Sequence, residues 1–274
     1  MSAPISSSSA RQAALAALIE PDPARKVALA LVLRDDLHQG RVSIDPPISV
    51  QKPPNAALPG RPEKPELIPA QQMPRRNPRD PRGHAALLHS IAHIEFNAIN
   101  LALDAVWRFQ DLPTDFYRDW IRVAAEEAEH FTLLRNHLRG SGAEYGDFPA
   151  HNGLWDMAEK TAGDFLARMA LVPRTLEARG LDVNPSIRAK LAAAGDARGA
   201  EILDRILADE IGHVAIGNRW YHWACAQTGC NPLTAHDELA AAFGAPRIKP
   251  PFNRDARLQA GFSAEELAQL ERAI

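Results

Sequence analysis

Two short stretches of this sequence place a carboxylate and an imidazole at helical spacing: Glu127 with His130, and Glu210 with His213. Residues three apart lie on one face of an α-helix, so each pair can direct both groups toward a single point. Two such pairs, together with one glutamate from each of two further helices, form the dimetal-carboxylate sites of four-helix bundles. The sequence therefore predicts a centre for two divalent metal ions.

Glu95 is the first candidate for the two further glutamates. Its neighbours on the same helical face are all apolar: Leu88, Ile91, Ala92, Ala98, Ile99 and Ala102. Glu127 and Glu210 lie on similar core-facing stripes. Buried carboxylates are unfavourable unless they are paired or bound to a cation, and several in one core repel each other. Divalent cations with neutral imidazoles would relieve that repulsion.

Glu177 and Glu159 compete for the fourth glutamate position. Glu95 and Glu127 are 32 residues apart, and Glu177 precedes Glu210 by 33, whereas Glu159 precedes it by 51. The near-equal gaps favour two similar helix pairs, so we expect Glu177. The predicted ligand set is Glu95, Glu127, His130, Glu177, Glu210 and His213.

Four long helical segments must position these ligands, at about 83–109, 114–139, 154–182 and 196–226, with a short helix between the last two that ends at Ala194. Segments of this length are typical of four-helix bundles. Pro173 lies inside the third segment, where an interior proline kinks a helix. The prediction is an all-α fold whose four-helix bundle spans residues 83–230.

Two regions flank the predicted bundle. Residues 1–45 form an N-terminal helical segment with a helix at 8–20, while 26–45 fits either a helix or a short extended piece. Residues 46–82 carry 11 of the chain's 22 prolines and are interpreted as a proline-rich arm or linker. Residues 231–274 form a C-terminal extension with short helices near 233–243 and from Ser263, where Glu266 has capping-box spacing.

Composition narrows the class of protein. A formal net charge of −3 gives no global basic field for nucleic acid. A local cluster of arginines lies at 75–82, and we favour a solvated linker over polyanion binding there. No run of 18 apolar residues predicts a membrane span, and the N-terminus lacks a secretory pattern, so we expect a cytoplasmic protein. Cys225 and Cys230 are expected to be a reduced pair. No dinucleotide, P-loop or nucleophile-elbow motif occurs.

Four strings carry a resemblance to a known family: His93–Glu95, Tyr145–His151, Leu171–Asp182 and Asp209–Val214. Over roughly residues 84–260 the chain resembles DUF455, a bacterial family of the ferritin-like dimetal-carboxylate superfamily. The run Glu177–Arg179 is also similar to a segment of the tRNA-hydroxylating di-iron monooxygenase family, which supports Glu177. The resemblance implies a ferritin-like four-helix bundle and a dimetal site, but it does not supply a substrate.

The predicted function follows from such a site. We expect an oxygen-dependent oxidoreductase, an oxidase or monooxygenase, that holds two iron ions, with manganese as the alternative metal. Its partners would be dioxygen, an unidentified small-molecule substrate and an electron donor, and the chain could form a homodimer. Two alternatives stay open: an iron-handling ferroxidase or metal-buffering protein, and a tRNA-modifying hydroxylase-like enzyme.

Overall fold

The computed structural model describes residues 8–44, 49–74 and 77–272. Helices form almost all of its regular structure, and the predicted all-α class is confirmed. Within the described residues, strand is limited to β1 (Ser8–Ser9) and β2 (Val42–Ser43), which pair in parallel. The chain divides into two compact units, one of residues 1–74 and 85–151, the other of residues 75–84 and 152–274.

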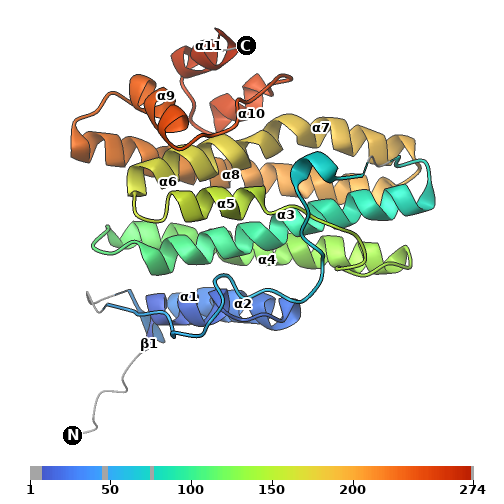
Figure 1. Cartoon of the computed structure of the whole chain (residues 1–274), viewed down its shortest axis with the longest axis horizontal. Coiled ribbons are helices and arrows are strands. Elements are labelled where there is room, and N and C mark those ends of the chain that lie inside the picture. The colour runs from blue at the N-terminus through green and yellow to red at the C-terminus, as the bar shows by residue number, and fades with distance from the viewer. Residues whose placement is uncertain (1–7, 45–48, 75–76, 273–274) are drawn as a thin grey trace, which may run out of the picture. The chain divides into compact units, whose positions relative to one another are not determined.

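The first unit contains α1 (Ala10–Leu18), α2 (Pro23–His38), η1 (Ala70–Gln72), most of α3 (Pro81–Arg108) and α4 (Thr114–Gly140). The ambiguous stretch after residue 26 is helical as far as His38. Asp22 caps α2 by accepting a hydrogen bond from Arg25 N, and Pro23 occupies the first helical position. Figure 1 shows α2 running along α4, which it contacts closely.

The proline-rich segment is fastened to the first unit at several points. Val50 O accepts the indole N–H of Trp107, and Gly60 N donates to Leu18 O. Further along, Ile68 N donates to Ala150 O and Ala150 N donates to Glu66 O. Of the predicted basic cluster, Arg75 and Arg76 lie outside the described residues, and Arg79 and Arg82 are exposed.

The second unit begins with a chain of short helices: α5 (Gly153–Lys160), α6 (Phe165–Leu171), the π-helix η2 (Val172–Glu177) and α7 (Ala178–Ala193). The prediction of one helix over 154–182 was therefore wrong. α5 ends before Asp164, which caps α6 by accepting a hydrogen bond from Ala167 N. Pro173 has no N–H to donate, and the helix widens into the π form around it. After η2, α7 continues through Pro185 to Ala193. The short helix that was predicted separately is therefore the second half of α7.

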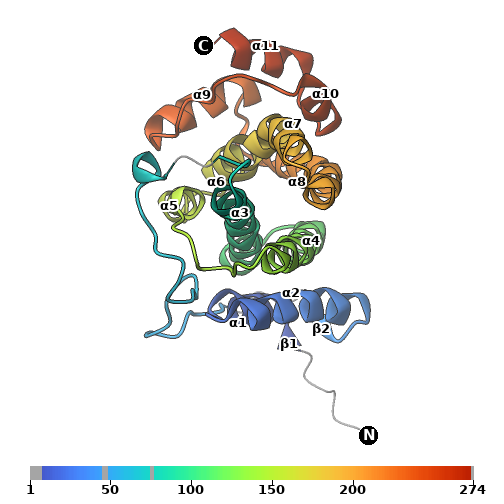
Figure 2. The same ribbon diagram turned by 90° about the vertical axis from the view of Figure 1, so that its right-hand side faces the viewer.

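The rest of the second unit consists of α8 (Ala197–Thr228), α9 (Pro232–Ala242), α10 (Arg254–Gln259) and α11 (Ala264–Arg272). Both views show α9, α10 and α11 gathered on one side of α6, α7 and α8 (Figures 1 and 2). The predicted capping box is confirmed, because Glu266 N donates to Ser263 Oγ and Ser263 N donates to the Glu266 carboxylate. Cys225 is a buried free thiol near the end of α8, and Cys230, just beyond that helix, is a half-buried one.

Close packing joins η2 to α8. A Cβ atom at Gly217 would lie 2.5 Å from Pro173 Cβ, so only glycine fits where the two elements meet. Val214, on the same helix, contributes to an apolar cluster with Ala178, Leu181 and Phe262. Of the helices in residues 8–44, 49–74 and 77–272, none combines the length and apolar composition that a membrane crossing needs.

Candidate metal centre

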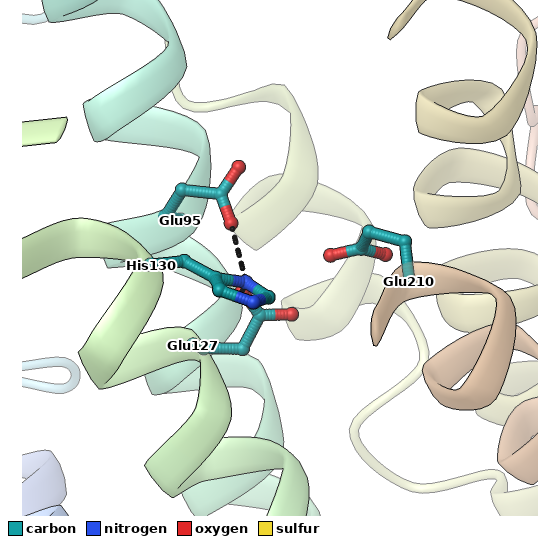
Figure 3. Close-up of side chains that lie close together, drawn as sticks. All are labelled: Glu95, Glu127, His130 and Glu210. Carbon is teal, nitrogen blue, oxygen red and sulfur yellow. Dashed lines mark hydrogen bonds and ion pairs between the residues drawn. The ribbon is translucent and has the colours of Figure 1, made fainter. Parts of the chain in front are cut away.

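Three of the predicted ligands lie together inside the first unit. Glu95 comes from the middle of α3, and Glu127 and His130 from adjacent turns of α4. One ligand atom from each of the three lies within 4.8 Å of the others. The Nδ1 atom of His130 is 3.3 Å from Glu95 Oε2 and 3.3 Å from Glu127 Oε2. In Figure 3 the two carboxylates approach the imidazole from different helices.

The cluster is buried, and its groups shift each other's pKa values. Glu95, Glu127 and His130 are all buried. Burial, with the neighbouring charge of Glu127, raises the pKa of Glu95 to about 7. Burial opposes the charge of His130, but its interactions with Glu127 and Glu95 outweigh that effect and raise its pKa to about 11. Without a metal ion the two carboxylates and the imidazole therefore hold protons among them, and a divalent cation bound to the same groups would displace those protons.

The donor set fits a divalent metal ion. Carboxylate oxygen and imidazole nitrogen are ligands that suit iron and manganese. Glu95 Oε2 is buried, and its 3.3 Å contact with His130 Nδ1 does not have hydrogen-bond geometry, so no described residue donates a hydrogen bond to it. A buried carboxylate oxygen without a donor is costly, and coordination to a metal ion would satisfy it.

Spacing alone did not single out two aromatic residues next to the candidate ligands, Tyr145 and His93. Tyr145 packs against Phe96 and Phe131, the residues that follow Glu95 and His130 in sequence, with ring centroids 5.4 and 5.0 Å away. Its hydroxyl is 2.9 Å from His93 Nδ1. Burial lowers the pKa of His93 to about 3, so this imidazole is neutral and shares a hydrogen bond with the Tyr145 hydroxyl. Tyr145, Phe96 and Phe131 thus form a buried aromatic layer next in sequence to two of the candidate ligands.

The other predicted ligands belong to the second unit. Glu210 and His213 lie one turn apart on α8, with Glu210 Oε1 3.5 Å from His213 Nδ1, so the second Glu-x-x-His pair has the geometry that its spacing predicts. Glu210, also labelled in Figure 3, is largely buried, and His213 is fully buried. Helical spacing therefore aligned both pairs as expected.

The two candidates for the fourth glutamate have different surroundings. Glu177 is half-buried at the last residue of η2. Glu159 is exposed near the end of α5, and its carboxylate accepts the indole N–H of Trp155 at 2.7 Å. Glu177 is the more buried of the two, but among the described residues its carboxylate does not form a close ligand group with Glu210 and His213, so its role as a ligand stays a prediction.

Comparisons with known proteins agree with the resemblance in the sequence. Residues 19–268 match the model of a family described as a protein of unknown function, DUF455. An uncharacterized protein of Haemophilus influenzae is 50% identical over 213 residues, which are 75% of this chain and 74% of that protein. No solved structure matches the chain. Because the family model covers most of its length, the chain belongs to the DUF455 family.

Proposed function

We propose that this protein is a dimetal-carboxylate oxidoreductase that uses dioxygen to oxidise a small organic substrate. In this proposal α3, α4, the run from α6 to α7, and α8 are the four helices of a ferritin-like bundle. Glu95, Glu127, His130, Glu177, Glu210 and His213 are its metal ligands. Two ferrous ions held by these residues would supply electrons for the reduction of dioxygen, and manganese is the alternative metal.

One observation carries the proposal: two buried carboxylates and one imidazole converge in the first unit. The duplicated Glu-x-x-His pattern supports it, because the pair on α8 has the same helical alignment. The aromatic layer of Tyr145, Phe96 and Phe131 would keep bulk water from the centre, which oxygen chemistry requires.

Anaerobic loading with Fe(II), followed by exposure to oxygen, tests this function. The wild type is expected to hold about two iron ions per chain and to consume oxygen after loading. Glu127→Gln should lose both properties, because Gln cannot supply the anionic ligand. Glu159→Gln serves as the matched control and should retain them. Full loading without oxygen uptake would refute the redox proposal and leave a structural metal site.

The same experiment separates the ferroxidase alternative. An iron-handling protein oxidises many added Fe(II) ions per chain without an organic substrate. An oxidase or monooxygenase consumes oxygen only in proportion to the iron bound at its centre until substrate and reductant are supplied. Sustained turnover with excess Fe(II) alone would therefore replace the proposed function with iron handling.

A further inference from the structure

The second unit contains a cavity of about 460 Å³ that the proposed metal chemistry does not use. Its walls come from η2, α9, the connector 243–253, α10 and α11. The volume lies in the range of small-molecule sites, which are mostly apolar with a few convergent polar groups. The cavity has this character: apolar side chains such as Leu233, Ala240, Ile248 and Phe262 line most of it.

Arg174 provides a fixed cation at the cavity. Its side chain is only 4% exposed. Tyr221 and Phe262 lie against the guanidinium, with ring centroids 4.7 and 4.5 Å away. Its two terminal nitrogens donate to Asn218 and Glu266, while its Nε–H has no acceptor among the described residues. A small shift of this side chain toward an occupant would satisfy the remaining donor.

A second polar group resembles a catalytic triad but does not act as one. Thr175 Oγ1 lies 2.9 Å from His236 Nε2, and His236 Nδ1 lies 3.3 Å from the Asp237 carboxylate. However, the Thr175 hydroxyl donates its single proton to Ala170 O at 2.7 Å. His236 Nε2–H must then be the donor to Thr175, so the imidazole cannot remove the hydroxyl proton. These groups therefore do not form a nucleophile.

One arginine of the lining has no carboxylate partner among the described residues. Glu266 is engaged by Arg174 and His222, and Asp237 accepts a hydrogen bond from Gln269. Arg257 is neutralised by Asp182, which lies outside the lining. Arg247 is exposed and forms no ion pair with any acidic residue in the described ranges. In the total for the lining the charge of Asp237 offsets that of Arg247, but no carboxylate of the described residues lies within ion-pair distance of Arg247, so an anionic group could pair with it.

We propose that this cavity binds a small amphipathic carboxylate, with its apolar body against Leu233, Ala240 and Phe262 and its carboxylate toward Arg247 and Arg174. The site is independent of the metal centre. Its predicted affinity does not require bound iron, so the test can fail or succeed whatever the outcome of oxygen uptake.

Fluorescence titration with dansylglycine, a fluorescent carboxylate, tests the site, with uncharged dansylglycinamide as the matched probe. Metal-free protein should bind dansylglycine at one saturable site, at least about fivefold more tightly than the amide, because a charge-assisted contact is lost in the amide. Equal binding of the two probes would overturn the assignment of an anion site. Absence of saturable binding would overturn the site itself.

Substitutions in the cavity wall test whether the probes bind there. Ala240→Trp, at a half-buried lining position, should fill the cavity and abolish binding of both probes; Ile248→Trp provides a second filled variant if the first does not fold. Arg247→Gln should remove the preference for the carboxylate. Arg254→Gln is the matched control, since Arg254 is exposed and pairs with Glu271 outside the cavity. Unchanged binding in the correctly folded filled variants would place the probe elsewhere and refute the proposal.

Discussion

Two sets of buried charged side chains, one in each unit, have different partners. In the second unit two buried arginines have carboxylate partners: Arg257 donates twice to Asp182, and Arg174 donates to Glu266. A third buried arginine, Arg168, donates instead to the Thr161 hydroxyl and to Ala158 O. In the first unit Glu95 and Glu127 share the single imidazole of His130. Paired ions need nothing more to be tolerated in a core, whereas two carboxylates with one cation leave a negative charge uncompensated unless a proton or a metal ion neutralises it. The paired arginines and carboxylates stabilise the fold, whereas the cluster of Glu95, Glu127 and His130 could hold a metal ion.

Breaking a balanced pair should have the largest effect on stability. Arg257→Met leaves the buried Asp182 carboxylate without its bidentate partner and should lower the free energy of unfolding by about 3–5 kcal/mol, measured by urea denaturation. Arg188→Met is the control, because Arg188 and Asp204 form an exposed pair. It should change stability by less than about 1 kcal/mol. Similar losses in both variants would contradict the distinction.

Removing a carboxylate from the cluster of Glu95, Glu127 and His130 should change two quantities in opposite directions, the stability of the metal-free protein and its affinity for iron. Glu127→Gln removes one of two competing carboxylates, so the metal-free protein should gain on the order of 1 kcal/mol of stability. The same change should weaken iron binding at least about 100-fold, measured by competitive chelator titration. Loss of stability in the metal-free variant would show that the two carboxylates and His130 are a structural network, not a site held under repulsion.

Packing between η2 and α8 can be tested with two glycines of one helix. Gly217→Ala places a Cβ against Pro173 and should cost about 1–3 kcal/mol, measured by thermal and urea unfolding. Gly212→Ala meets no atom within 4 Å and should stabilise α8 by as much as about 1 kcal/mol. Equal changes in the free energy of unfolding at both positions would mean that η2 moves away from the added Cβ at no cost in stability.

Lys26 tests how the first unit holds a buried cation. Its Nζ donates to Leu18 O and Gly60 O at 2.9 Å and also to Asn100 Oδ1, and burial lowers its pKa to about 7. Between pH 7 and the ordinary lysine pKa, the unfolded chain binds more protons than the native state. Stability should therefore rise from pH 7 to pH 9, by on the order of 2 kcal/mol relative to Lys26→Met. A constant difference between the two proteins would show that the ammonium stays charged in the native state.

Helical spacing predicted the first unit's cluster because α3 and α4 are regular where the ligands lie. The predicted helices 83–109 and 114–139 correspond to α3 and α4 within two residues at either end, so the alignment of Glu127 with His130 was preserved. The same reasoning failed over 154–182. A break before Asp164 and the wider turns around Pro173 change the angular position of every later residue, so helical spacing cannot assign the face on which Glu177 lies.

Long-range partners could not be predicted for a different reason. Arg174 and Glu266 are separated by 92 residues, and His93 and Tyr145 by 52. Such pairs arise from tertiary packing and leave no periodic pattern in a single sequence. The cavity of the second unit depends on the same kind of contact, because its walls come from helices that are distant along the chain.

The proline-rich segment lowers the conformational entropy of the unfolded chain. It is anchored at Val50, Gly60 and Ile68, and its prolines have restricted φ angles even before folding. Fixing such a segment removes fewer conformations than fixing a flexible loop of equal length. A stretch that forms almost no helix or strand can thereby hold α1 and the region around Ala150 in place at a small entropic penalty.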